Sequence, residues 1–204
     1  MKRIFLIVFL LAVIVTTTSA QEKKISFGLK TGINLSIFSA SINSEASWLT
    51  GFHFGGYMKT SLAEKIAFRP ELYCSSQGQK DEYIQPPNGP SIGETTTKAN
   101  YLNVPLLFEF GNKVSFQAGP QLGFLLSATE KGTVQGQDVD NDLKDIMKGS
   151  DFSLVLGSGV QLGNNFNLGA RLNLGLSEVF DGSGENGFPS IKNRVFHFYI
   201  GYTF

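Results

Sequence analysis

The chain has 204 residues, with 17 basic and 17 acidic side chains and a single cysteine, Cys74. This balance of charge gives no sign of a nucleic-acid partner. A lone cysteine excludes an internal disulfide, and it excludes a metal centre built on several thiolates.

The amino-terminal segment has the parts of a secretory signal peptide. Lys2 and Arg3 precede an apolar run at residues 4–15, and small or hydroxylated residues lead to Ala20. We expect a signal peptide at 1–20, cleaved after Ala20, and one domain at 21–204. The alternative is a retained anchor, but the run is shorter than the ~17–25 residues that a membrane-spanning helix needs.

The rest of the chain repeats one pattern, in which large apolar side chains alternate with small or polar ones. In the last segment, for example, Phe196 and Phe198 alternate with His197 and Tyr199. A period of two predicts a strand with one apolar and one polar face. The pattern predicts strands at 25–38, 48–60, 66–78, 98–110, 114–128, 151–163, 166–177 and 193–204. Pro70 predicts a bulge or a local break in pairing within the third strand.

The predicted connections alternate in length. Short ones fall at 61–65, 111–113 and 163–165, and long ones at 39–47, 79–97, 129–150 and 178–192. Short turns on one side and long loops on the other are typical of outer-membrane barrels, with periplasmic turns and extracellular loops.

Alternation alone does not decide which face meets lipid, because a soluble lipocalin-like barrel also alternates, with its apolar face inward. Two features favour the membrane form. The polar face is rich in Gly, Ser, Asn and Gln, which suit a crowded lumen. The apolar face carries Phe or Leu on nearly every strand, too bulky for the narrow interior of eight strands. We therefore predict an all-β fold, an eight-stranded antiparallel up-and-down transmembrane β-barrel in the outer membrane.

Several segments carry a family resemblance: F-G-L-K-T-G-I-N-L-S at 27–36, A-F-R-P-E-L-Y at 67–73, Y-L-N-V-P-L-L-F at 101–108, Q-A-G-P-Q-L-G-F-L-L-S at 117–127 and the final Y-I-G-Y-T-F. The chain resembles the PorT-like, porin-family outer-membrane β-barrel proteins typical of Bacteroidota. The resemblance implies the barrel fold over nearly all of the mature chain. One namesake of the family is implied in protein secretion, and no residue here carries that role over.

The ionisable residues of the polar face form the candidate site. They are Lys30, His53, Lys59, Arg69, Glu71, Glu109, Arg171 and His197. An unpaired charge in a dry interior is costly, so one interpretation is a network of ion pairs that fills and stiffens the lumen. The other is a narrow pore, although open aqueous channels come with about 16 strands.

Other motifs are weaker. Residues 182–187 spell G-x-G-x-x-G without the strand and helix that make it a phosphate site, so we expect a loop. Asp138 to Asp142 resembles a calcium loop, but Leu143 and Gly149 stand where Gly and Glu are needed. Residues 85–90 form a stiff, Pro-rich loop segment. Cys74 is expected to be a small hydrophobe on the lipid face. The sequence predicts no cofactor and no metal site.

A lipid-modifying enzyme is a further class of outer-membrane barrel. A histidine-based acyl hydrolase needs a nucleophile and an acid near its base at the membrane rim. His53 and His197 both fall on the lumen face, and no serine pairs with either by any motif. We expect no enzyme activity.

The sequence leaves two functions open. The first is surface binding or envelope integrity through the long extracellular loops; the alternative is a narrow pore or accessory subunit of an outer-membrane transport or secretion system. Expected partners are outer-membrane lipid, the barrel assembly machinery and an extracellular or envelope protein. Tyr202 and Phe204 resemble the carboxy-terminal aromatic signal that the assembly machinery of such barrels reads.

Overall fold

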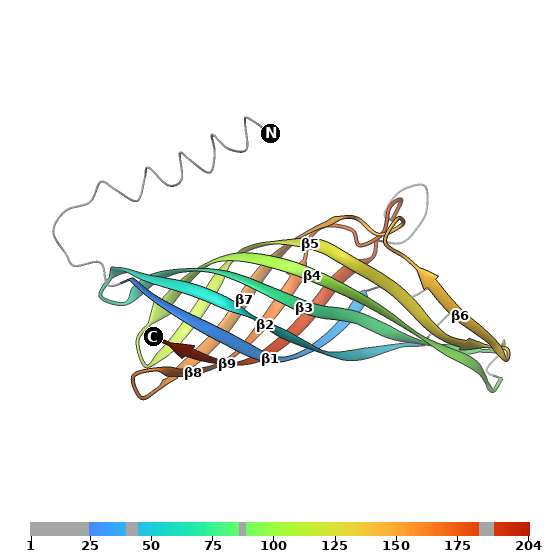
Figure 1. The fold of residues 1–204 in the computed structure, drawn as a ribbon, viewed down its shortest axis with the longest axis horizontal. Helices are drawn as coiled ribbons and strands as arrows, with labels where there is room; N and C mark the ends of the chain where they lie inside the picture. The colour runs from blue at the N-terminus through green and yellow to red at the C-terminus, as the bar shows by residue number, and fades with distance from the viewer. Residues whose placement is uncertain (1–24, 40–44, 86–88, 184–189) are drawn as a thin grey trace.

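The computed structural model describes residues 25–39, 45–85, 89–183 and 190–204 (Figure 1). The expected signal peptide at 1–20 lies outside the described residues. The strands in this part of the chain are β1 (Ile25–Ser39), β2 (Glu45–Ala63), β3 (Ile66–Ile84), β4 (Ser91–Gly111), β5 (Val114–Val134), β6 (Gln137–Asp142), β7 (Ser150–Leu162), β8 (Phe166–Gly175) and β9 (Lys192–Thr203). Within this part of the chain, no helix is long and apolar enough to cross a membrane.

Eight of these strands close into a ring. Each pairs antiparallel with its neighbours in the order β1, β2, β3, β4, β5, β7, β8 and β9, and β9 pairs back to β1. Closure leaves the backbone groups of the ring paired on both sides, as a bilayer requires. Figure 1 shows the tilted strands of this ring, with the carboxy terminus at the end that carries the short turns. The predicted up-and-down barrel is confirmed.

The faces lie as the alternation predicts. Large apolar side chains point outward and are exposed, for example Phe52 at 71%, Phe116 at 66% and Phe27 at 60%. Their neighbours along the strands point inward and are buried, including His53 at 2% and Gln117 at 2%. Every strand of the ring carries exposed large apolar side chains, and an apolar surface around the whole ring is what hydrocarbon requires.

The strands at the long-loop end extend farther than the sequence pattern predicts. Residues 79–97, predicted as a loop, instead continue β3 and begin β4, and these two strands pair as far as Ile84 and Ser91. Residues 129–150, also predicted as a loop, contain the end of β5 and the additional strand β6. The predicted strand ends there are wrong, because these segments pair with one another beyond the ring.

Pro70 interrupts the hydrogen-bonded ladder without shifting it. Pairing of β2 with β3 runs to Tyr57 and Glu71 and resumes at Thr60 and Phe68 in the same register. Proline lacks the N–H that would donate to the neighbouring strand. Of the two predicted outcomes, the structure has the local break and not a bulge.

Candidate functional site

The centre of the lumen is an ionic cluster around Glu71 on β3. Its carboxylate accepts hydrogen bonds from Lys30 Nζ at 2.6 Å and from Arg69 Nε at 2.8 Å. Arg171 on β8 donates to both carboxylate oxygens, each at 2.7 Å, in the two-pronged geometry that gives the strongest pairs. The Glu71 side chain is 0% exposed, so one carboxylate holds three cations out of reach of bulk water.

Glu109 on β4 forms a second cluster closer to the short turns. It accepts hydrogen bonds from Lys59 Nζ at 2.6 Å, Arg69 Nη1 at 3.3 Å and Gln117 Nε2 at 3.0 Å. Arg69 therefore joins the two carboxylates into one network. Gln117 also accepts a hydrogen bond from Arg171 Nε at 2.7 Å, which closes the network around the lumen.

Tyrosine rings add stabilisation to the ionic network, which has four cations and two carboxylates. Lys30 Nζ lies 4.0 Å from the centre of the Tyr73 ring, and the Arg69 guanidinium lies 3.8 Å from that of Tyr57. Arg171 lies 4.6 Å from the ring centre of Tyr199. The negative faces of the rings attract these cations, and the attraction is stronger in a desolvated site.

Two glycines leave the space that these rings occupy. A Cβ on Gly28 would lie 2.2 Å from Cζ of Tyr57, and one on Gly169 would lie 2.4 Å from Cζ of Tyr199. No side chain fits at such distances. These two glycines therefore help to form the ionic network, because they allow the rings of Tyr57 and Tyr199 to lie flat across a neighbouring strand.

A neutral polar layer lies on the long-loop side of the charges. Tyr73 Oη donates to Gln121 Oε1 at 2.7 Å, and Asn173 Nδ2 donates to the same oxygen at 3.1 Å. The two histidine rings meet here, with 3.4 Å between the Nδ1 atoms of His53 and His197. The histidines contact other side chains that fill the lumen. Asn34 Oδ1, for example, lies 2.6 Å from His53 Nδ1.

An apolar cap closes the long-loop end of the lumen. It consists of the buried residues Phe38, Ala99, Tyr101, Leu125, Ala128, Met147 and Val179, with Leu143, Phe180 and Ile191 packed against them. Two segments beyond the strands pair over it, because Lys148 N donates to Val179 O at 2.8 Å and Asp181 N to Ile146 O at 3.0 Å. A charge-free plug thus follows the polar layers.

The cap is fastened to β9 by Glu178. Its carboxylate accepts hydrogen bonds from Ser190 Oγ and from the backbone N–H of Ile191, both at 2.7 Å. The hydrogen bond from Ser190 is the main cause that lowers the pKa of Glu178. The segment after β8 is therefore tied to the start of β9 by a carboxylate that stays ionised.

The short-turn end is open by comparison. A polar hollow of about 980 Å³ lies there, lined by Ser26, Lys59, Ser61, Asn112, Lys113, Gln161, Gly163, Asn164, Asn165, Thr203 and Phe204. It ends at the Lys59–Glu109 pair, beyond which the lumen side chains are buried to within a few per cent. The hollow is therefore a vestibule and not a passage through the described part of the barrel.

Beyond the ring, the ends of β2, β3, β4 and β5 continue with β6 as a protruding sheet. Its rows run across all five strands, for example from Ser47 through Lys80, Thr96 and Lys131 to Asp140. In Figure 1 this sheet forms the end of the molecule opposite the carboxy terminus. Lys131 and Asp140 form an exposed ion pair at 2.9 Å.

The structure brings all eight ionisable residues predicted for the lumen into one interior. Six of them form the ionic network, and the two histidines lie in the neutral layer. Sequence reasoning missed the part played by Tyr57, Tyr73 and Tyr199. The sequence did indicate that these tyrosines lie on the polar face, because they fall at the same alternate positions as the charged residues.

The weaker motifs do not form sites. Asp138 to Asp142 is strand β6, so these residues pair with β5 and do not curl into a calcium loop. Most of the Gly-rich stretch at 182–187 lies outside the described residues. Cys74 is exposed on the outward face, as predicted. Within the described part of the chain, no three residues among His, Cys, Asp and Glu are grouped to hold a metal.

A closed antiparallel ring, apolar outside and polar inside, defines an integral membrane β-barrel. The chain belongs to the family described as outer membrane protein beta-barrel domain, whose sequence profile matches residues 19–181. It is therefore an outer-membrane barrel protein, and the PorT-like subdivision stays a prediction. No curated protein matches the chain.

Several solved structures are similar. Ail, the attachment invasion locus protein of Yersinia pestis, shares 13% identity over 90% of this chain and 100% of its own, with a TM-score of 0.48. Neisserial surface protein A shares 14% identity over 89% and 98%, with a TM-score of 0.46. OprG from Pseudomonas aeruginosa shares 10% over 89% and 97%, with a TM-score of 0.43.

Proposed function

We propose that this protein is a cell-surface binding protein, in which the barrel is the membrane anchor and the protruding sheet is the binding element. The observation that carries the proposal is the edge of β6. Within the described residues β6 pairs with β5 alone and stands last in the sheet, so its other edge has no partner strand. An exposed strand edge is a template for an added strand.

The geometry of the hairpin specifies which groups of β6 face outward. Gln135 and Gly136 have positive φ angles of 53° and 75°, which define a two-residue type I′ turn. In such a hairpin the flanking residues exchange hydrogen bonds, and bonded and non-bonded pairs then alternate. The backbone groups of Asp138, Asp140 and Asp142 therefore point away from β5, toward the free edge.

The charge of β6 indicates the kind of strand that fits. The three aspartates lie at alternate positions, so their side chains share one face of the sheet. Opposite charges at facing cross-strand positions are favourable and like charges are unfavourable. The edge therefore favours an extended segment with Lys or Arg at alternate positions, and it disfavours a second copy of β6.

The other reading, a narrow pore or a subunit of a transport or secretion system, has less support. Arg69, Glu71 and Arg171 block the centre of the lumen with charge-assisted hydrogen bonds and are 3–4% exposed. Envelope integrity is compatible with the same anchor, and no contact in the described residues favours it.

A proline substitution tests the edge directly. Asp140→Pro removes the outward N–H of β6 and leaves the hydrogen bonds to β5, since proline is tolerated on an edge strand. The matched control, Asp140→Asn, loses the same charge and keeps the N–H. The probe is a fluorescent peptide of alternating lysine and threonine, with an alternating glutamate and threonine peptide as its counterpart.

We expect the refolded protein to bind the lysine peptide, as measured by fluorescence anisotropy. Asp140→Asn should retain most of that binding, and Asp140→Pro should lose it. Equal binding of the two peptides, or unchanged binding by Asp140→Pro, would remove the basis for a role of the β6 edge.

A further inference from the structure

The outward face of β3, β4 and β5 changes in composition toward the long-loop end. Three cross-strand rows follow one another there. The first is Cys74, Leu102 and Phe124; the second is Ser76, Asn100 and Ser127; the third is Gly78, Lys98 and Thr129. Lys80 lies beside Thr96 in the next row. The surface therefore passes from apolar, through hydroxyl and amide groups, to cationic.

The spacing of these rows places the lysines at headgroup level. A row is two residues, about 6.7 Å along the strand, or roughly 5 Å along the membrane normal at a tilt of about 40°. Lys98 lies two rows beyond Leu102, and Lys80 lies three rows beyond Cys74. Polar headgroups add roughly 5–8 Å on each side of the hydrocarbon. Lysine side chains can bend back by several ångströms, so both ammonium groups reach that layer.

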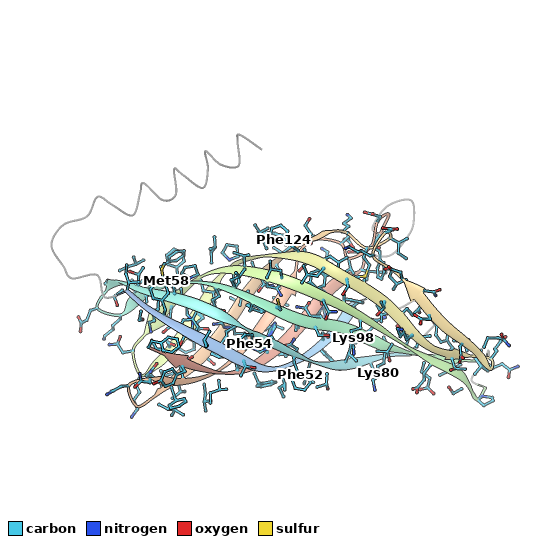
Figure 2. All side chains as sticks on the ribbon, in the orientation of Figure 1. Phe52, Phe54, Met58, Lys80, Lys98 and Phe124 are labelled. Atoms are coloured by element: carbon cyan, nitrogen blue, oxygen red, sulfur yellow. The ribbon has the colours of Figure 1, made fainter. Side chains whose placement is uncertain are left out.

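The side chains of Lys80 and Lys98 are both exposed. Among the described residues neither belongs to an ion pair, whereas Lys131 on the neighbouring strand is paired with Asp140. Lys80 and Lys98 are diagonal neighbours on one face, close enough for both to contact one phosphate. Figure 2 shows Phe54, Phe52, Lys98 and Lys80 in succession along the barrel toward the long-loop end.

Two glutamates of this face lie farther from the apolar band, while Asp142 and Asp140 on β6 share the rows of Lys98 and Lys80 but lie on the far side of β5. Glu82 and Glu94 pair directly across β3 and β4, one row beyond Lys80. The cations thus lie between the acidic row and the membrane. Only a negative group that approaches from the membrane side meets the lysines before it meets the glutamates.

We propose that Lys80 and Lys98 bind the phosphate of an anionic lipid in the leaflet at the long-loop end. The acyl chains of this lipid lie on the apolar surface that includes Phe52 and Leu102. The site is part of the surface through which the barrel contacts its membrane. It does not depend on the proposed binding of a partner strand to the edge of β6. Its ligand is a phosphate lipid headgroup, recognised by charge at a fixed depth.

Trp48 provides a local reporter. It is the only tryptophan in the chain, it is 43% exposed, and it pairs with Gln79, next to Lys80. The refolded protein is placed in uncharged sugar-detergent micelles with phosphatidic acid or phosphatidylcholine whose acyl chains carry bromine. Bromine quenches tryptophan on contact, so the two titrations compare an anionic and a zwitterionic lipid at this position.

We expect brominated phosphatidic acid to quench Trp48 at a lower mole fraction than brominated phosphatidylcholine. A cation near a membrane surface contributes about 1 kcal/mol, which is about fivefold in affinity. Lys80→Gln or Lys98→Gln should each reduce the preference about fivefold, and the double variant should reduce it tenfold or more. Lys98→Arg should retain it.

The control is Lys65→Gln with Lys113→Gln, which removes two exposed lysines from the short turns at the opposite end. This variant should keep the wild-type preference. Three results would overturn the proposal: no preference in the wild type, an undiminished preference in the Lys80→Gln/Lys98→Gln variant, or an equal loss in the control. The last would indicate a response to net charge alone. Folding of each variant is checked first by its heat-dependent mobility on a gel.

Discussion

The substitution Glu71→Gln tests the ionic network of the lumen most sharply. Glutamine preserves the shape of the side chain and removes its charge. The native carboxylate accepts four hydrogen bonds, from Lys30, from Arg69 and twice from Arg171, at 2.6–2.8 Å. In the variant these three cations remain buried without their common counter-ion, while Arg69 keeps its contact with Glu109.

The expected cost is about 3–5 kcal/mol, the usual consequence of removing one partner of a buried ion pair. Adding the four hydrogen bonds separately would overestimate it, because they share one acceptor and the tyrosine rings continue to hold the cations. At a urea dependence of about 2 kcal/mol per molar, the unfolding midpoint should fall by roughly 2 M.

The assay is reversible urea unfolding in phosphatidylcholine vesicles, followed by Trp48 fluorescence and by gel mobility. Glu94→Gln, on the exposed face of the protruding sheet, is the matched control and should change stability by less than about 0.5 kcal/mol. A double-mutant cycle with Arg171→Met should give a coupling energy of more than about 1 kcal/mol. If Glu71→Gln costs no more than Glu94→Gln, the lumen network does not stabilise the barrel.

Three further changes test other parts of the structure. Phe198→Lys, at an outward position near the middle of β9, should cost about 2–4 kcal/mol in vesicle unfolding, and Leu126→Lys, near the edge of the apolar band, about 0–1 kcal/mol; equal costs would contradict the assigned depths. Deletion of Phe204, which is 72% exposed, should barely change the stability of the refolded protein but should lower its outer-membrane level in cells; normal levels would argue against an assembly signal. Gly169→Ala places a Cβ 2.4 Å from the Tyr199 ring and should cost about 1–3 kcal/mol in the same unfolding assay, and a neutral result would show that the ring need not lie there.

The strands of the ring and their two faces were predictable because lipid and lumen impose opposite demands on alternate residues. Phe196, His197 and Phe198 illustrate this, since the two phenylalanines face outward and the histidine is 1% exposed. That constraint ends with the bilayer. Thr95 and Thr97 lie in the outer half of β4, beyond the apolar band, where both faces of the strand are mostly polar, so no apolar alternation marked that half.

The sequence pattern did not predict strand β6, for a related reason. Asp and Asn are rare in strands, and the sequence Q-D-V-D-N-D has four of them in six residues. Its turn is Gln135–Gly136, whereas the usual sequence signals for this turn type are Asn-Gly and Asp-Gly. Cross-strand contacts such as Lys131–Asp140 stabilise the pairing, and they become visible only when the register is known.

The alternation along each strand predicted which residues face the lumen. It did not predict which of these side chains contact one another. Arg171 and Glu71 lie on β8 and β3, which are not neighbours in the ring. Their contact depends on the tilt and stagger of the closed barrel, which set the height of each side chain. Composition along a strand carries no information on that stagger, so the ion pairs and the tyrosine–cation contacts required the structure.

The central claim is that the lumen is closed by its own side chains and that the work of the protein lies outside the barrel. Planar-bilayer recordings of the refolded protein test it most directly. A lumen blocked by Glu71, its three cations and the apolar cap predicts no steady unitary current at any applied voltage that the bilayer withstands. Steady unitary currents from the wild-type protein, absent in matched bilayers without it, would contradict the claim.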